Sequence, residues 1–210
     1  LAGGLALGIS PAATAKNAGA TAQAIPWGPD APSGNELSAW IAIAADNSVT
    51  FRVPTPEIGN GAMTQVAMNL AEELACDWAD VRIEFSSVQR DYVEKGVYTS
   101  GFLPFFGGHG TDKVRMAYAL QLGASARERL KAAAAARWQV PAAEITTDNG
   151  VLRHKSGVEL RYGDVAAAAA SVTLAAEPAL KPRSEWTFLG KASPAKLHIP
   201  DIVCGKAVFG

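Results

Sequence analysis

The chain has 210 residues, of which 49% are hydrophobic, and its formal net charge is −1 at neutral pH. This length suits one domain with a substantial core, and the near-neutral charge gives no support for nucleic-acid binding. The only cysteines, Cys76 and Cys204, are too few for a disulfide framework or for a zinc or iron–sulfur ligand set. We expect both to be packed thiols, and we predict no metal ligand in this chain.

The first 37 residues are predicted to be a signal remnant and a linker. Residues 1–15 are small and apolar, as at the end of an export signal, and are too short for a membrane span of ~20 residues. Because no basic segment precedes them, we expect the chain to begin part-way through a longer, periplasmic product. A floppy alanine-rich terminus is the alternative. Residues 11–39, rich in Ala, Gly, Pro, Ser and Asn, predict an extended lead-in outside the core.

Ordered structure is expected to begin at Trp40. Two apolar runs around residues 46–48 predict a β-hairpin. Residues 64–74 have helical periodicity, with an apolar face, and with Glu72 and Glu73 placed elsewhere on the helix. Residues 81–88 then alternate as a half-buried strand does.

The longest predicted helix covers residues 111–137, with Thr111 as its N-cap. Gly123 in its middle indicates a neighbour packed unusually close, since glycine there costs ~1 kcal/mol relative to alanine. A second hairpin, turning at residues 148–150, leads into another helix. The chain is therefore predicted to be an α+β fold with antiparallel hairpins packed against helices.

Two glycine-rich loops precede helices. Gly59 and Gly61 lie before the helix at 64–74, and residues 107–111 ("GGHGT") lie before the long helix. Helix N-termini carry unsatisfied N–H donors and a partial positive charge, so both loops are candidate anion cradles. Two ordinary tight turns are the alternative.

The residues of the loops limit which class of ligand they could bind. No G-x-x-x-x-G-K-[ST] motif occurs, which excludes the phosphate loop of NTPases. A nicotinamide-dinucleotide site stays open, because Gly59 and Gly61 follow a strand and Glu84 lies on the next strand, where a ribose-binding acid belongs. Against it, Thr64 occupies the third glycine position and the opening strands resemble a hairpin instead of a parallel crossover.

Residues 39–85 resemble the N-terminal part of the large subunit of bacterial molybdenum hydroxylases, in the xanthine oxidase family. The similarity is to the branch of isoquinoline 1-oxidoreductase β-subunits and membrane-associated aldehyde dehydrogenases. Its signature is Glu-x-Gly-Gln-Gly-x-x-Thr followed by Ala-Glu-Glu-Leu, and it stands here as Glu57, Gly59, Asn60, Gly61 and Thr64, then residues 71–74. The family's second loop, of Gly-Gly-Ser-Ser-Ser type before a helix with Gly-Ala-x-Ala-Arg, stands here as Gly107, Gly108, His109, Gly110 and Thr111, then residues 123–127.

By this resemblance, both loops line molybdopterin cytosine dinucleotide, and their eight residues are the predicted cofactor-binding set: Gly59, Asn60, Gly61, Gly107, Gly108, His109, Gly110 and Thr111. Asn60 replaces the family's glutamine, and His109 replaces a serine. His109 is either a phosphate contact or a solvated loop residue. The family's catalytic base is a glutamate near the far C-terminus of the large subunit, so no catalytic residue is predicted here and Glu57 is expected to brace its loop.

The resemblance also implies three regions: residues 1–37, a portion of the molybdopterin-binding domain at 38–195, and the start of a hammerhead domain at 196–210. It implies an oxidoreductase that hydroxylates aldehydes or N-heterocycles with water-derived oxygen, in which this fragment alone is inactive. Implied partners are the rest of the large subunit, a small subunit carrying [2Fe–2S] clusters and often a cytochrome c subunit. The alternatives are an NAD-binding oxidoreductase domain and a non-catalytic binding or assembly module with the same fold.

Overall fold

The computed structural model describes residues 28–55, 57–99, 113–191 and 194–207. The predictions for residues 1–27 and for the second glycine loop, residues 107–111, lie outside this range. Helices and sheets are mixed as the sequence predicts, so the α+β class is confirmed.

The larger sheet has four strands in the order β1-β2-β3-β4, with the bounds Glu36–Ser38, Ile41–Ile43, Val49–Val53 and Val81–Phe85. The first three strands are antiparallel, and β2 and β3 form the predicted hairpin. Asn47 takes the left-handed conformation at the turn, with φ 81°, which asparagine tolerates better than most side chains. The fourth strand, β4, runs parallel to β3.

The parallel pair corrects the sequence analysis, which expected only antiparallel pairing. Helix α1 (Ala62–Leu74) carries the chain from the end of β3 back to the start of β4. The opening hairpin is thus followed by a parallel crossover, and the two features do not exclude each other. The predicted apolar face is confirmed, since Ala67, Leu70 and Leu74 are fully buried.

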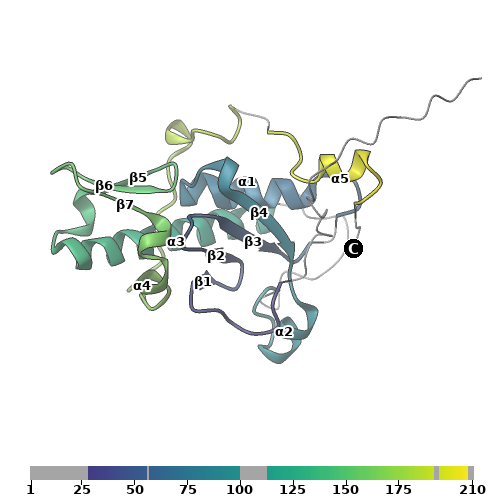
Figure 1. The fold of residues 1–210 in the computed structure, drawn as a ribbon, viewed down its shortest axis with the longest axis horizontal. Helices are drawn as coiled ribbons and strands as arrows, with labels where there is room; N and C mark the ends of the chain where they lie inside the picture. The colour runs from purple at the N-terminus through teal and green to yellow at the C-terminus, as the bar shows by residue number, and fades with distance from the viewer. Residues whose placement is uncertain (1–27, 56, 100–112, 192–193, 208–210) are drawn as a thin grey trace, which may run out of the picture.

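Helix α3 (Lys113–Trp138) lies beside α1 on the same face of the sheet (Figure 1). Their closest approach is at Gly123, where a Cβ atom would lie 2.6 Å from the carbonyl oxygen of Leu70 and 2.9 Å from Cβ of Glu73. Only glycine leaves room for this contact, so the predicted close packing is confirmed.

The smaller sheet is an antiparallel meander at the opposite end of the molecule's long axis from the C-terminal helix α5 (Figure 1). Its predicted turn is confirmed, because Asn149 and Gly150 take φ angles of 47° and 74°, the positive pair of a type I′ turn. The strands are β5 (Ile145–Asp148), β6 (Val151–His154) and β7 (Glu159–Arg161). The short helices are α2 (Val88–Val93), α4 (Ala166–Ala170), α5 (Ile199–Val203), and the 3₁₀ turns η1 (Trp78–Asp80), η2 (Ala142–Glu144), η3 (Tyr162–Asp164) and η4 (Arg183–Glu185).

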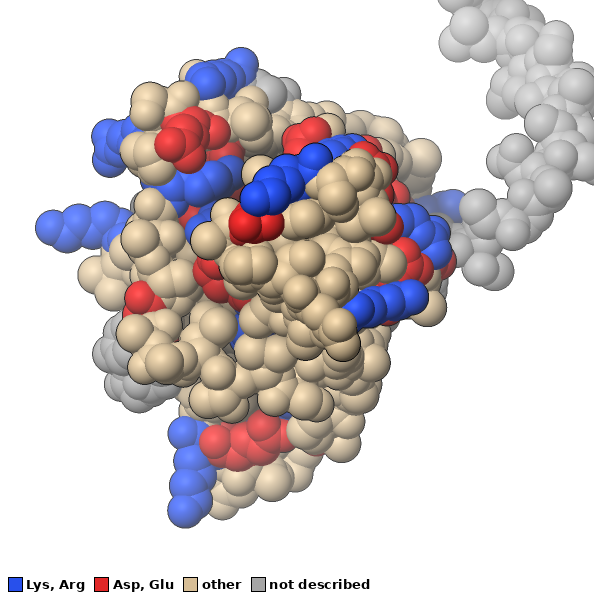
Figure 2. Space-filling view, turned by 90° about the vertical axis from the view of Figure 1, so that its left-hand side faces the viewer, with Lys and Arg blue, Asp and Glu red and all other residues tan. Residues whose placement is uncertain are grey.

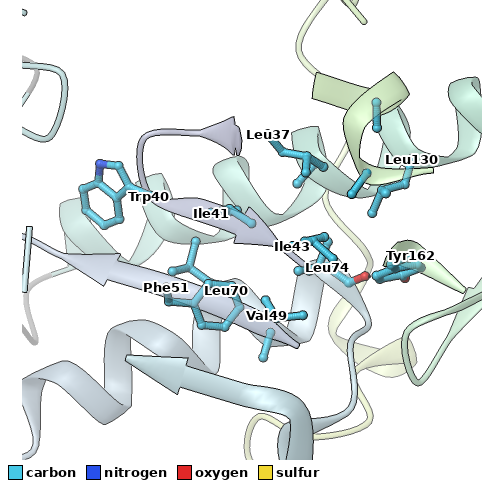
Figure 3. Packing of buried hydrophobic residues seen from close by; sticks show 14 of the residues in the cluster. Leu37, Trp40, Ile41, Ile43, Val49, Phe51, Leu70, Leu74, Leu130 and Tyr162 are labelled. Atoms are coloured by element: carbon cyan, nitrogen blue, oxygen red, sulfur yellow. The ribbon is translucent and has the colours of Figure 1, made fainter. Parts of the chain in front are cut away.

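One hydrophobic core joins the larger sheet to α1 and α3 (Figure 3). Leu37 of β1 belongs to it and is 2% exposed. Ordered structure therefore begins before Trp40, contrary to the prediction. Tyr162, which directly follows β7 and is fully buried, donates its hydroxyl to the carbonyl of Leu74 at 2.7 Å and so connects the smaller sheet to α1.

Acidic and basic side chains are interspersed on the face that Figure 2 shows, and no patch of one sign dominates it. The described helices include none that is long and apolar enough to cross a membrane. Cys76 is partly buried, but Cys204 is exposed, so the prediction of two packed thiols is wrong for Cys204. Cys204 follows the short helix α5 at the surface, a position that composition could not reveal.

Candidate functional site

The first glycine loop connects the end of β3 to the start of α1, and a buried carboxylate accepts hydrogen bonds from its backbone. Oε1 of Glu57 accepts hydrogen bonds from the backbone N–H of Gly59, at 2.7 Å, and of Gly61, at 2.9 Å. Glu57 itself is fully buried. The expectation that it braces the loop is confirmed, and charge-assisted bonds of this kind are about twice as strong as neutral ones.

This bonding also answers why the loop needs glycine. Gly59 and Gly61 have φ angles of 96° and 79°, which side-chain-bearing residues rarely adopt. Their N–H groups are directed to the protein's own carboxylate, so these two donors are not an open anion cradle. The glycines serve first to wrap the backbone around Glu57.

The outer surface of the loop remains open. Ile58 is 61% exposed, Gly59 and Asn60 are exposed as well, and a Cβ built on Gly59 would meet nothing within 4 Å. Oδ1 of Asn60 accepts from the N–H of Ala62 at 3.2 Å, at the start of α1. The loop thus presents bare backbone at a fixed place in front of a helix, where a flat ligand could lie.

The structure brings the three residues of the first loop together, but residues 107–111 lie outside the described range. Helix α3 is described from Lys113, so the predicted N-cap at Thr111 stays a prediction.

Glu72 and Glu73 have a role that their place away from the predicted apolar face of the helix did not indicate. Both are buried, at 1% and 0% exposure. Glu72 holds a long segment, which we call the docked segment (residues 179–189): its carboxylate accepts from Nζ of Lys181 at 2.7 Å and from three backbone N–H groups, those of Thr187, Phe188 and Leu189. Burial raises the pKa of Glu72, but these bonds outweigh it and hold the pKa below its ordinary value.

Glu73 forms the second anchor of the docked segment. Its carboxylate accepts from the guanidinium of Arg127 on α3 at 2.7 Å and from the backbone N–H of Lys181 at 3.0 Å. Arg127 also donates to the carbonyl of Ala179 at 3.3 Å. The two helix motifs, at residues 71–74 and 123–127, therefore form one packing unit. The available signal in the sequence was the pair of motifs itself, two successive glutamates in one predicted helix and an arginine in the other.

Glu84, the candidate ribose-binding acid, is already engaged. Its carboxylate accepts from Nε of Arg52 at 3.0 Å. Arg52 also pairs with Glu36, which receives two further hydrogen bonds from Arg90 at 2.9 and 3.0 Å. A parallel crossover with a glycine loop is present, but its acid and its glycine N–H groups are committed to internal bonds. This geometry does not favour a nicotinamide site.

Other features of the described residues point elsewhere. A hollow of about 420 Å³ lies between α1, the turn of the second hairpin and the docked segment, lined in part by Cys76 and Phe188. None of its lining residues belongs to the glycine loop. No cluster of three or more His, Cys, Asp or Glu side chains suited to a metal ion occurs among the described residues.

Comparisons with known proteins agree with the motifs. The isoquinoline 1-oxidoreductase subunit beta of Brevundimonas diminuta is 32% identical over 209 residues, covering 81% of this chain and 26% of that protein. The membrane-bound aldehyde dehydrogenase [pyrroloquinoline-quinone] of Gluconacetobacter polyoxogenes is 26% identical, covering 83% of this chain and 22% of that protein. The chain thus spans about a quarter of the length of the curated relatives it matches.

Among solved structures, quinoline 2-oxidoreductase from Pseudomonas putida 86 aligns over 61% of this chain and 15% of that chain, with 18% identity and a TM-score of 0.39. The family assignment does not depend on so distant a likeness. It depends on the family model of the molybdopterin cofactor-binding domain, which matches residues 3–199. This chain therefore belongs to the molybdopterin cofactor-binding domain family.

Proposed function

We propose that this chain forms one wall of a molybdopterin site, in the cytosine dinucleotide form of the cofactor, within a larger oxidoreductase. The observation that carries the proposal is the family match over residues 3–199. Both curated relatives named above are oxidoreductases by name, which supports the same general kind of activity.

The described residues fit this role in one respect and restrict it in another. The exposed tip at residues 58–60 is free of side-chain bulk at Gly59 and is held from below by buried Glu57. A pterin or a nucleotide could lie flat against such a surface. The N–H groups of Gly59 and Gly61 donate to Glu57, so other donors would have to bind the phosphate oxygens. For this role we propose the residues of the second loop, His109 and Thr111 among them.

The reaction that we propose is hydroxylation of an aldehyde or N-heterocycle with oxygen from water. The molybdenum centre, when bound, would supply the two-electron redox chemistry, and this chain would position and shield the cofactor. Electrons would leave through [2Fe–2S] clusters on a partner subunit, with a cytochrome c subunit as a further partner. The same proposal includes a hammerhead domain that would begin at residue 196. It also includes export to the periplasm, which cell fractionation tests.

Cofactor analysis of the native protein with its partners tests the proposal. We expect acid treatment to release molybdenum and a cytosine nucleotide from the protein in equal molar amounts. Pyrroloquinoline quinone, which the name of one relative includes, should be absent from the extract. Finding the quinone without molybdenum would contradict the proposal, as would saturable binding of NAD(H) with neither. Finding none of the three would favour a non-catalytic module.

A substitution at the loop tip tests the site itself. Ile58→Asp places a carboxylate on the exposed surface where an anionic cofactor would lie, and because Ile58 is 61% exposed the fold should tolerate it. Bound molybdenum and nucleotide should fall together, by about tenfold. Val158→Asp, at a residue 44% exposed in the turn between β6 and β7, is the matched control and should keep both. Full occupancy in Ile58→Asp would remove the loop from the site.

A further inference from the structure

The segment just before α5 contacts the glycine loop and the start of α1; Figure 1 shows α5 beyond the end of the larger sheet. Nζ of Lys196 donates to the carbonyl of Gly59 at 2.7 Å. The backbone N–H of Leu197 approaches Oγ1 of Thr64 at 3.4 Å. Gly59 in the loop and Thr64 in the first turn of α1 are thereby bonded to a segment more than 130 positions away in the chain.

Two buried polar side chains lie beside these contacts. Glu57 is fully buried and His198 is 5% exposed. Oε2 of Glu57 lies 3.8 Å from Nε2 of His198, and Nζ of Lys196 lies 3.9 Å from Oε1. A buried carboxylate is costly unless it is paired and hydrogen-bonded. The N–H groups of Gly59 and Gly61 bond Oε1 of Glu57, whereas Oε2 of Glu57 and Nε2 of His198 face each other at 3.8 Å and neither has a hydrogen-bond partner among the described residues.

We propose that Lys196 and His198 are positioning residues, which act through Glu57 and Gly59 to hold the loop tip in its cofactor-facing conformation. We call the group Glu57, Lys196 and His198 the latch. The two glycines of the loop have positive φ angles and little intrinsic preference for one conformation. Hydrogen bonds must therefore order the loop: Glu57 supplies two of them from within the segment, and Lys196 supplies one from outside, at the carbonyl of Gly59. This inference depends on the proposed function for its cofactor, but its structural half does not.

Paired substitutions separate positioning from simple stability. Lys196→Met removes the ammonium and keeps the aliphatic stem, whereas Lys196→Arg retains a donor. His198→Leu removes the ring nitrogen that lies 3.8 Å from Oε2 of Glu57, whereas His198→Gln places an amide nitrogen near the position of Nε2. Lys191→Met, at an exposed lysine five residues earlier, is the control for loss of a lysine.

The measurement is amide hydrogen exchange of residues 57–64 in the native protein, before and after cofactor extraction, together with bound molybdenum. Lys196→Met and His198→Leu should each speed exchange in this segment about tenfold, which corresponds to ~1.4 kcal/mol, and lower bound molybdenum. Lys196→Arg and His198→Gln should restore both, and Lys191→Met should change neither.

Unchanged exchange in the loop would overturn the latch, as would an equal increase in Lys191→Met. Faster exchange with full molybdenum content would overturn its positioning role toward the cofactor. A wild-type protein without molybdenum would overturn the proposed function instead, and the exchange measurement would then decide by itself whether the latch orders the loop.

Discussion

Replacement of Gly123 by alanine should have two opposing effects on stability, because alanine has the higher helix propensity but its Cβ needs room between α1 and α3. In an exposed helix, alanine is favoured over glycine by ~1 kcal/mol. At Gly123 the new Cβ would lie 2.6 Å from the carbonyl oxygen of Leu70, 2.9 Å from Cβ of Glu73 and 3.2 Å from the backbone nitrogen of Leu74. Two of these atoms are backbone, so side-chain rotation cannot relieve the contact, and α1 and α3 must move apart.

Overpacking of a well-filled interior costs ~1–3 kcal/mol, and occasionally more. Because two contacts fall below 3 Å and one involves a backbone oxygen, we expect the upper part of that range. After subtraction of the propensity gain, Gly123→Ala should destabilise the α1–α3 unit by ~2 kcal/mol. Native-state hydrogen exchange in both helices should then be about 30-fold faster.

Gly34→Ala is the matched control, because a Cβ at Gly34 would meet nothing within 4 Å. Its effect on exchange in α1 and α3 should be small. Slower exchange in Gly123→Ala would refute the argument, since the sign would show that propensity outweighs the close approach of the helices.

Three further predictions concern buried polar groups. Glu73→Ala should cost ~3 kcal/mol, the lower part of the range for breaking a buried pair, because Arg127 loses its fully buried partner but keeps Glu128 at 3.0 Å; in urea unfolding, the double variant with Arg127→Met should recover part of that loss, and strict additivity would contradict the pairing. Burial raises the pKa of Cys76 to about 12, so at neutral pH iodoacetamide should label the exposed Cys204 and spare Cys76, as peptide mass mapping would reveal. Burial raises the pKa of Glu72, yet its hydrogen bonds hold it below the ordinary 4.5, so its contribution is complete above that pH and is lost as the pH falls through the lower folded value. Limited proteolysis of the docked segment should therefore increase only below pH 4.5, and Glu72→Gln should remove most of this pH dependence.

Local signals in the sequence predicted the local structure well. Asn149 and Gly150 mark a turn because few residue types accept positive φ at both positions. The apolar face of α1 repeats with the helical period, so its buried side was predictable from Ala67 and Leu70. Glu57 was expected to brace its loop because the related family has its catalytic base elsewhere, and the bonds that it accepts from Gly59 and Gly61, two and four residues later, are local. In each case the deciding interaction lies within a few residues along the chain.

Tertiary structure decided what depends on partners far apart in sequence. The parallel pairing of β3 with β4 depends on where α1 returns the chain, which no pattern within either strand encodes. Glu73 reads as an exposed helical residue until Arg127, 54 positions later, pairs with it. Glu57 is local to its glycine loop, but its full burial beside Lys196 and His198, about 140 positions later, is a product of the tertiary structure. Periodicity and motif spacing identify which groups need a partner, but only the packed chain determines which partner satisfies them.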